Sequence, residues 1–244
     1  MINTFEAIEH MKKAAVSAGE FLASQESFNI TKKDDASYVT NLDVEVQNII
    51  TEYLTKFFPD IPYVLEEGDS TAVQDVLYQW CIDPIDGTHN FIQGIPYYGF
   101  SIGLLKNKKP YLGVIYDPVR KKIFSHDTIP QHLNHEKKYA TIASGRGHDE
   151  KYKNIEAQAI QSLLAQDGIK YRRFSSAALD LAHLAHGNID GVILIGNSIW
   201  DYAAGFALLQ DRDDITISEC VPHVFVVSRN DIHGTLVSII QSSI

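Results

Sequence analysis

Cysteine is scarce in this sequence, and its two copies lie far apart. Cys81 and Cys220 are the two thiols among 244 residues, and neither belongs to a Cys-x-x-Cys pair. Two unclustered thiols in a chain of this length are typical of a reduced, cytosolic protein, because small secreted domains depend on dense disulfide frameworks. We expect both cysteines to be small, buried hydrophobic side chains.

Long apolar runs are missing as well. No run in the sequence approaches the roughly 18 residues that a membrane-spanning helix needs. Residues 1–20 do not resemble a secretion signal, because Glu6, Glu9, Lys12 and Lys13 interrupt any apolar core there. We therefore expect a soluble, cytoplasmic protein with no membrane partner.

Positive charge is in short supply. The 21 Lys and Arg residues are outnumbered by 31 Asp and Glu, and the formal net charge is −10. An acidic chain repels nucleic acid unless it carries a local basic patch, and the basic runs at 106–109 and 120–122 are short. We therefore expect no nucleic-acid partner. An anionic substrate would need a local source of positive charge, and this requirement points to metal ions.

What the sequence does contain is alternating helix and strand patterns, expected to form a single domain over residues 1–244. Apolar spacing predicts helices over 4–24 and from Asn41 or Asp43 to Phe57, with a polar loop at 32–40 between them. Further strands are expected at 61–65, 77–82, 99–105, 111–116, 122–125, 139–143, 169–174, 190–195 and 224–227, and further helices at 152–166, 176–186, 200–209 and 232–240. Hairpins in the first half and alternation in the second predict a mixed α/β fold of layered sheets and helices.

The most informative segment is 80–91, Trp-Cys-Ile-Asp-Pro-Ile-Asp-Gly-Thr-His-Asn-Phe. An apolar strand delivers Asp83 at its end, and Pro84 is expected to stop the strand because proline cannot donate a ladder hydrogen bond. Asp86 follows after a turn, so both carboxylates can point into one space. Gly87 permits a tight backbone path, and free N–H groups from Thr88 onward can hold a phosphate.

Two carboxylates held this close together repel each other. At a separation of about 4 Å and an effective dielectric constant of about 20, the repulsion costs roughly 4 kcal/mol. A divalent cation relieves it, and so does a retained proton. The alternative is an Asp-rich turn whose carboxylates cap backbone N–H groups. The full Asp-Pro-x-Asp-Gly-Thr run is specific enough to favour the metal site.

This segment carries a resemblance to a known family. Asp83-Pro84-Ile85-Asp86-Gly87-Thr88 resembles the first signature of the inositol monophosphatase family, part of the lithium-sensitive sugar-phosphatase group. Leu65-Glu66-Glu67-Gly68 resembles its paired-glutamate element, and Trp200-Asp201-Tyr202-Ala203-Ala204-Gly205 resembles its second signature. Weaker likeness covers 32–43, 99–118 and 175–179. The resemblance implies a layered αβαβα sandwich, a homodimer, and Mg²⁺-dependent hydrolysis of a small phosphate monoester by metal-activated water.

The resemblance also implies the ligands of the metal ions. Glu66, Asp83 and the backbone carbonyl of Ile85 would hold one Mg²⁺. Asp83, Asp86 and Asp201 would hold a second, with Asp83 bridging the two ions. Glu67 would support a third, weaker ion, and Li⁺ is expected to inhibit.

The remaining implied roles concern water and substrate. Thr88 and Glu66 would orient the attacking water, and Asp43 would accept a hydrogen bond from Thr88. The backbone N–H groups of Gly87 and Thr88 would hold the phosphate, and Asp201 would also contact the substrate.

Several alternatives remain open. A 3′(2′),5′-bisphosphate nucleotidase or a fructose-1,6-bisphosphatase of the same group would share the metal site, whereas a non-catalytic binding protein that kept the fold would need no such charge cluster. Taken alone, Asp201 would be interpreted as a helix-capping residue and not as a metal ligand. Residues 144–147 indicate a turn that is a weak candidate for phosphate contact, and 211–214 a solvated surface turn.

The sequence departs from the family pattern in places that bear on the substrate. Leu65 stands where glycine commonly precedes the glutamates, the stretch from Phe124 to Tyr139 is shorter than usual, and 210–212 replaces a Glu-Ala-Gly-Gly element. In the animal enzymes an acidic residue seven positions before the second-signature aspartate contacts substrate hydroxyls. That position is Leu194, which cannot accept hydrogen bonds. We expect a broader substrate range than that of a strict inositol monophosphatase.

Overall fold

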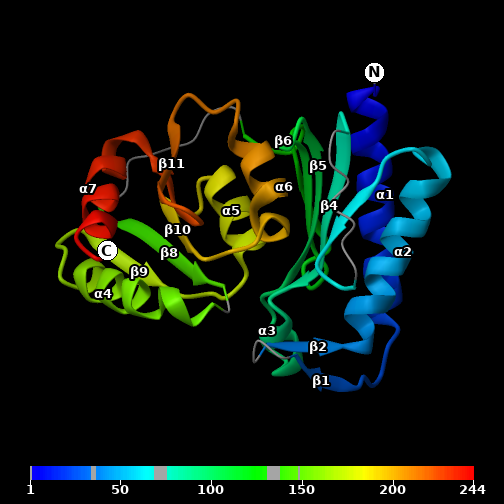
Figure 1. Ribbon diagram of the computed structural model, residues 1–244, viewed down its shortest axis with the longest axis horizontal. Helices are drawn as coiled ribbons and strands as arrows, with labels where there is room; N and C mark the ends of the chain where they lie inside the picture. Colours follow the sequence, from blue (N-terminus) through cyan, green and yellow to red (C-terminus); the bar gives the residue numbers. More distant parts are fainter. Residues whose placement is uncertain (1, 34–36, 69–75, 131–137, 148) are drawn as a thin grey trace.

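Five layers of helices and sheets stack on one another in a computed structural model that describes residues 2–33, 37–68, 76–130, 138–147 and 149–244 (Figure 1). Helices α1 (Thr4–Ala23) and α2 (Asn41–Phe57) form one outer layer, α5 (Ala177–Ala185) and α6 (Ile199–Leu209) the central layer, and α4 (Lys153–Leu164) and α7 (Asn230–Gln241) the other outer layer. A five-stranded sheet lies on each side of the central helices. The expected αβαβα sandwich is confirmed.

The first sheet presents its acidic strand ends side by side. Its strands lie in chain order: β3 (Tyr63–Leu65), β4 (Tyr78–Asp86), β5 (Gly99–Lys106), β6 (Lys109–Asp117) and β7 (Lys122–Ser125). Strands β3 and β4 are parallel, and the other pairs are antiparallel. Parallel strands end at the same edge of a sheet, so Glu66 and the Asp83–Asp86 segment lie close together.

Two helices that follow strands of the second sheet begin near the acidic edge of the first sheet. Its order is β11 (Ile215–Val221), β12 (Val224–Arg229), β10 (Gly191–Ile195), β8 (Ala140–Arg146) and β9 (Ile169–Arg172), with β10, β8 and β9 parallel. Helix α5 follows β9 and helix α6 follows β10. The starts of both helices therefore lie at the carboxyl ends of these strands, where open α/β layers place their ligand-binding groups.

Helix α6 packs unusually closely on the first sheet, which brings Asp201 near β4. A Cβ atom at Gly113 on β6 would overlap the backbone of Ala204, and one at Gly103 on β5 would lie 3.2 Å from the Ala203 Cβ. Glycine at both positions removes the side chains that would hold the helix away. Asp201 is in the first turn of this helix, two residues before Ala203.

The structure corrects several expected boundaries in the first half. Helix α2 is capped by Thr40, not by Asn41 or Asp43; the Asp43 side chain instead accepts from the Thr40 N–H at 2.8 Å in a capping box. The expected loop at 32–40 contains the ends of a hairpin, β1 (Ile30–Lys32) and β2 (Tyr38–Thr40). Pro84 does not end its strand, because β4 continues to Asp86 through a bulge.

Other corrections concern the second half. Residues 144–146 end strand β8 and do not form the expected turn, and β11 was not expected at all. The expected solvated turn at 211–214 has a mostly buried Arg212, which donates to the carbonyls of Pro130 and Ala185. Leu194 is fully buried in the core. The shortened stretch after Phe124 falls partly outside the described residues, at 131–137.

Within the described ranges, no helix combines the length and the apolar character that crossing a membrane requires.

Candidate active site

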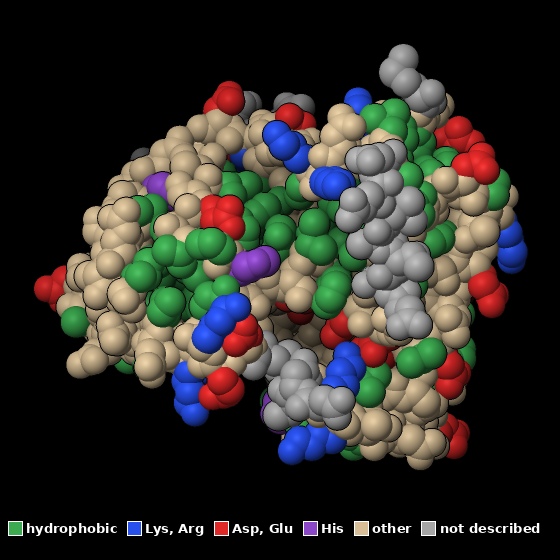
Figure 2. Space-filling model, in the orientation of Figure 1, with side chains coloured by type: hydrophobic (Ala, Val, Ile, Leu, Met, Phe, Trp, Pro, Cys, Tyr) green, Lys and Arg blue, Asp and Glu red, His purple; other side chains and the backbone are tan. Residues whose placement is uncertain are grey.

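Three aspartates from both halves of the chain meet at the facing sheet edges. Asp83 and Asp86 come from β4 and Asp201 from α6, and one carboxylate oxygen from each lies within 4.8 Å of the others. They line a cleft of about 1440 Å³ together with Glu66, Ile85, Gly87 and Thr88. Figure 2 shows this hollow between the two halves, with acidic side chains in its depth.

Two of the aspartates are each anchored through a single oxygen. Asp86 Oδ2 accepts from the Ser176 hydroxyl and from the Ala178 N–H, both at 2.6 Å. Asp201 Oδ2 accepts from the Ser198 N–H at 2.8 Å and from Asn197 Nδ2 at 3.1 Å. The cap of α6 is thus Ser198 and not Asp201, which is the third residue of the helix and completes the capping box. Anchoring one oxygen leaves the other available to a ligand.

Asp83 lies at the centre of the cluster. Its side chain is buried, and its Oδ1 atom has no hydrogen-bond partner among the described residues. A buried acceptor left unpaired costs free energy, and such atoms in native proteins call for a specific explanation. A cation bound between the carboxylates would satisfy this oxygen.

The pKa values of the cluster show how poorly it tolerates its own charge. Burial, followed by repulsion from Glu66, Asp86 and Asp201, raises the pKa of Asp83 well above its ordinary value. Burial likewise raises the pKa of Asp86 to about 6 and those of Glu66 and Asp201 to about 7. At neutral pH the cluster therefore retains protons unless a cation compensates its charge.

These residues fit a small divalent cation. All donors are oxygens, the type that Mg²⁺ prefers, and Mg²⁺–oxygen bonds of roughly 2.1 Å place two ligands of one ion at most about 4.2 Å apart. The three aspartate oxygens lie within 4.8 Å of one another, which is close to that spacing although the bound is slightly wider. Together with the unpaired Asp83 oxygen, the donor set favours a metal site over an acidic turn.

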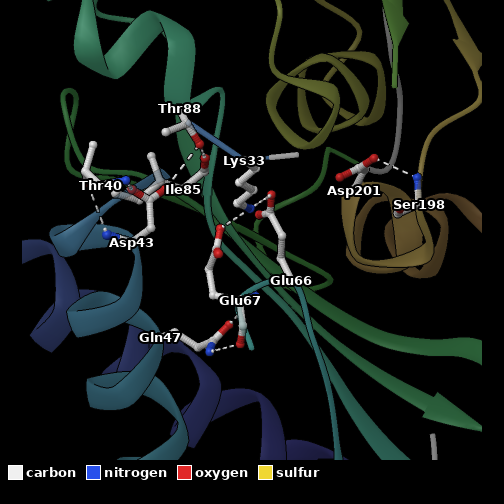
Figure 3. Close-up of polar contacts among 10 residues, drawn as sticks. All are labelled: Lys33, Thr40, Asp43, Gln47, Glu66, Glu67, Ile85, Thr88, Ser198 and Asp201. Carbon is white, nitrogen blue, oxygen red and sulfur yellow. Dashed lines mark hydrogen bonds and ion pairs between the residues drawn. The ribbon is translucent and has the colours of Figure 1, made fainter. Parts of the chain in front are cut away.

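Lys33 and Gln47 hold the paired glutamates (Figure 3). Lys33 Nζ lies 2.6 Å from Glu67 Oε1 and 3.5 Å from Glu66 Oε1. Gln47 on α2 donates to the Glu67 carbonyl at 2.7 Å and accepts from the Glu67 N–H at 3.1 Å. Helix α2 therefore fixes the backbone of this segment, while Lys33 neutralises part of its charge. Glu66 lines the cleft, and Glu67 is buried beside it.

Thr88 stands between the cleft and a buried acid (Figure 3). Its hydroxyl lies 3.1 Å from Asp43 Oδ1 and 3.0 Å from the Ile85 carbonyl oxygen. Asp43 is fully buried behind Thr88, and burial raises its pKa. Gly87 precedes Thr88 at the start of the short helix α3 (Thr88–Ile92) and has φ +97°, a conformation that favours glycine.

Several of these supporting residues were not expected from the sequence. Ser176, Gln47, Lys33 and Asn197 each bind a site residue, yet isolated small polar residues give no pattern to recognise. Lys33 and Ser176 each had one available signal, since they lie in the 32–43 and 175–179 stretches that weakly resemble the family. The expected ligand residues Glu66, Asp83, Ile85, Asp86 and Asp201 all line the one cleft.

Comparison with known proteins gives a consistent picture. The model of the inositol monophosphatase family matches residues 5–212. A protein named Nus factor SuhB from Pasteurella multocida is 30% identical over 88% of this chain and 86% of its own length. An inositol-1-monophosphatase from Mesorhizobium japonicum is 31% identical, over 82% of this chain and 81% of its own. The crystal structure of the suppressor protein SuhB from Bartonella henselae superposes with a TM-score of 0.86 at 26% identity, covering 98% of this chain and 100% of that one.

The five-layered fold and its acidic cleft define the class as phosphoric monoester hydrolases. Because the family model covers most of its length, this chain belongs to the inositol monophosphatase family.

Proposed function

We propose that the chain, acting as one phosphatase domain, hydrolyses a small phosphate monoester in a Mg²⁺-dependent reaction. The observation that carries this proposal is the Asp83, Asp86 and Asp201 cluster, which is drawn from both halves of the chain. Its anchored oxygens keep the cluster in place, and the unpaired Asp83 oxygen faces neighbours of the same charge. A structural role alone would not require such a costly arrangement.

Glu66, Asp83 and the Ile85 carbonyl would hold one ion, and Asp83, Asp86 and Asp201 a second. When bound, Mg²⁺ supplies the Lewis acidity that makes water nucleophilic at neutral pH and stabilises charge on the leaving oxygen. A third ion at Glu67 would have to displace Lys33, whose ammonium already lies 2.6 Å away.

The residues around Thr88 would position the water. Asp43 is held by the N–H and hydroxyl of Thr40, so its Oδ1 faces Thr88 in a fixed orientation. When Thr88 donates its hydrogen to Asp43, its oxygen lone pairs point toward the cleft and can accept a hydrogen bond from water. Glu66 would accept the second hydrogen of that water and act as its base.

The backbone at the start of α3 would hold the phosphate. The left-handed conformation of Gly87 turns the chain so that the N–H groups of Gly87 and Thr88 can face one bound oxyanion. Asp201, on the opposite side, would contact the leaving part of the substrate. The backbone N–H groups of Gly87 and Thr88 are preorganised donors, which stabilise a transition state without needing to reorient.

Three classes of substrate fit the proposed metal site. An inositol phosphate or related polyol phosphate, a 3′(2′),5′-bisphosphate nucleotide and fructose 1,6-bisphosphate would all reach the same metal site. A homodimer, a cytoplasmic location and the absence of nucleic-acid binding stay predictions from the sequence.

A phosphate-release assay with purified protein tests the proposal. Mg²⁺ and a panel of inositol, sugar and nucleotide phosphates should give hydrolysis that disappears in Asp83→Asn. Release of phosphate from none of these compounds, or undiminished release by Asp83→Asn, would contradict it. Binding without turnover would favour the non-catalytic alternative.

A further inference from the structure

The aspartate cluster is assembled from two halves of the chain that anchor each other. Asp86 belongs to β4 in the first half, and its donors, Ser176 and Ala178, belong to the second half. The two donors that hold the Asp201 carboxylate both precede it on its own segment. They orient Asp201 on α6, but they do not fix the helix relative to β4.

A buried serine supplies this connection. Ser101 is fully buried on β5, and its hydroxyl donates to the Trp200 carbonyl oxygen at 2.9 Å. This carbonyl belongs to the peptide unit that joins Trp200 to Asp201, in the first turn of α6. A carbonyl oxygen has two lone pairs, so it can accept from Ser101 in addition to a helical N–H. The hydroxyl therefore ties the backbone of the Asp201 turn to the first sheet.

Ser101 is also the cross-strand neighbour of Asp83. The antiparallel ladder between β4 and β5 places these two residues directly opposite each other. Opposite residues of such a ladder project on the same face of the sheet, with Cβ atoms about 4.5–5.5 Å apart. Ser101 thus lies beside one aspartate of the cluster and holds the backbone next to another, although Trp200 follows it by 99 residues.

The face of β5 toward α6 offers the helix few other directional contacts near the cluster. Side chains alternate along a strand, and the residues on this face are Gly99, Ser101 and Gly103. Gly103 lets Ala203 of α6 approach so closely that an added Cβ atom would lie 3.2 Å from the Ala203 Cβ. Glycine permits close approach but does not fix a position along the strand. A hydrogen bond is directional, so Ser101 fixes where α6 packs on the sheet.

This hydrogen bond does not depend on the protonation of the cluster. Its donor is a hydroxyl and its acceptor a carbonyl, so neither group carries a charge near neutral pH. The interaction of Asp83 with Asp201, in contrast, is repulsive once both carboxyls are ionised. Ser101 therefore keeps the two carboxylates near each other in the metal-free protein, where their own charges would separate them.

We propose that Ser101 is a positioning residue for the second metal ion. It sets Asp201 against Asp83 and thereby determines how tightly the aspartates bind the ion that they share. The ion assigned to Glu66, Asp83 and the Ile85 carbonyl does not use Asp201 and does not depend on Ser101. The inference rests on the proposed Mg²⁺-dependent function, and it gives a role in that function to a residue that does not line the cleft.

Mg²⁺ binding to the metal-free protein tests this role without turnover. Calorimetry on the wild type should resolve two binding steps, and Asp201→Asn should lack the step of the shared ion. Ser101→Ala should weaken that step by about three- to tenfold, the loss expected for one neutral hydrogen bond, and leave the other step unchanged. In turnover, the Mg²⁺ concentration for half-maximal activity should rise by the same factor, and saturating Mg²⁺ should restore most of kcat.

A double-mutant cycle separates positioning from stability. In Asp201→Asn, the further change Ser101→Ala should leave Mg²⁺ binding as it is, because the hydroxyl acts through Asp201. Its cost in Tm should persist, since the Trp200 carbonyl loses the same hydrogen bond in either background. If Ser101→Ala does not fold, Ser101→Cys keeps a weaker donor and should shift the same step in the same direction.

Gln210→Ala is the matched control. Gln210 follows the last residue of α6, and its side chain donates to the Tyr111 carbonyl on β6 at 3.1 Å. This hydrogen bond joins the same helix to the same sheet at the end away from the cluster. Its loss should leave both Mg²⁺ binding steps unchanged.

The outcomes distinguish this inference from the proposed function. Unchanged Mg²⁺ binding in Ser101→Ala, equal weakening of both steps, or an effect that persists in Asp201→Asn would overturn the role of Ser101 and leave the phosphatase proposal intact. A wild type that binds no Mg²⁺ would overturn both.

Discussion

Asp83→Asn should make the metal-free protein more stable at neutral pH, although it removes a residue proposed to be essential. Asp83 is the most enclosed member of a cluster in which burial and mutual repulsion raise every pKa. Asparagine has nearly the same shape and no charge. The substitution therefore relieves repulsion in the apo protein and removes a metal ligand from the loaded one.

The magnitude can be worked from Asp201. Raising its pKa from 3.8 to about 7 corresponds to roughly 4 kcal/mol of unfavourable interaction once the carboxyl ionises. A pKa raised by folding means that stability is highest below the unfolded value, near 4, and is lost as the pH rises through about 7. Neighbouring carboxyls share this cost, so we expect Asp83→Asn to recover about 2 kcal/mol at pH 7.5, or roughly 4–8 °C in Tm for a chain of this size.

Thermal unfolding in EDTA and in Mg²⁺, between pH 5 and pH 8, measures the effect. In EDTA the wild type should lose stability across this range and Asp83→Asn should lose less; in Mg²⁺ the order should reverse. Asp117→Asn is the control, because Asp117 is buried and pairs with Arg120 at 2.8 Å but lies outside the aspartate cluster. Its effect should be the same with and without Mg²⁺. A destabilised Asp83→Asn in EDTA at pH 7.5 would refute the reasoning.

Three further predictions concern catalysis. EDTA should abolish phosphate release and Mg²⁺ restore it, with Li⁺ inhibiting on titration; full activity in chelator would exclude the metal mechanism. Thr88→Ala should lower kcat more than it raises KM, while Thr88→Ser keeps most of the activity, because the hydroxyl acts on the attacking water; a change confined to KM would contradict this role. Leu194 is buried in the core and does not line the cleft, and a leucine has no atom that accepts a hydrogen bond from a polyol. Inositol 1-phosphate should therefore not be preferred over β-glycerophosphate or 2′-AMP by a hundredfold in kcat/KM, about 2.7 kcal/mol; a larger preference would refute broad specificity.

The sequence predicted best those parts of the site that are contiguous in the chain. Asp83, Asp86, Gly87 and Thr88 fall within six residues, so the local backbone sets their positions relative to one another. The layered fold was likewise predictable, since periodicity indicates strands and helices and the family resemblance supplies their stacking. The order of strands in the second sheet was not predicted, because periodicity says nothing about which strands pair.

The errors came from local rules that tertiary contacts override. Pro84 lies inside β4 because the ladder to β5 breaks at a bulge between Asp83 and Asp86, where no proline N–H is needed. The sequence offered Asn41 and Asp43 as caps of α2, but Thr40 is the N-cap. Asp43 takes part as the third helical residue, whose side chain completes the capping box. The Ser176 contact with Asp86 joins residues 90 apart in the chain, a separation that no local pattern encodes.

The division of the acidic site between the two halves has a consequence for the newly made protein. Asp86 is anchored by Ala178, which follows it by 92 residues, and Asp201 is later still. While the ribosome is extending the first half of the chain, Asp201 and the groups that anchor Asp86 do not yet exist. The nascent polypeptide therefore lacks the full set of residues proposed for the second ion, and binding of that ion would have to wait until helix α6 has been translated and packed against the first sheet.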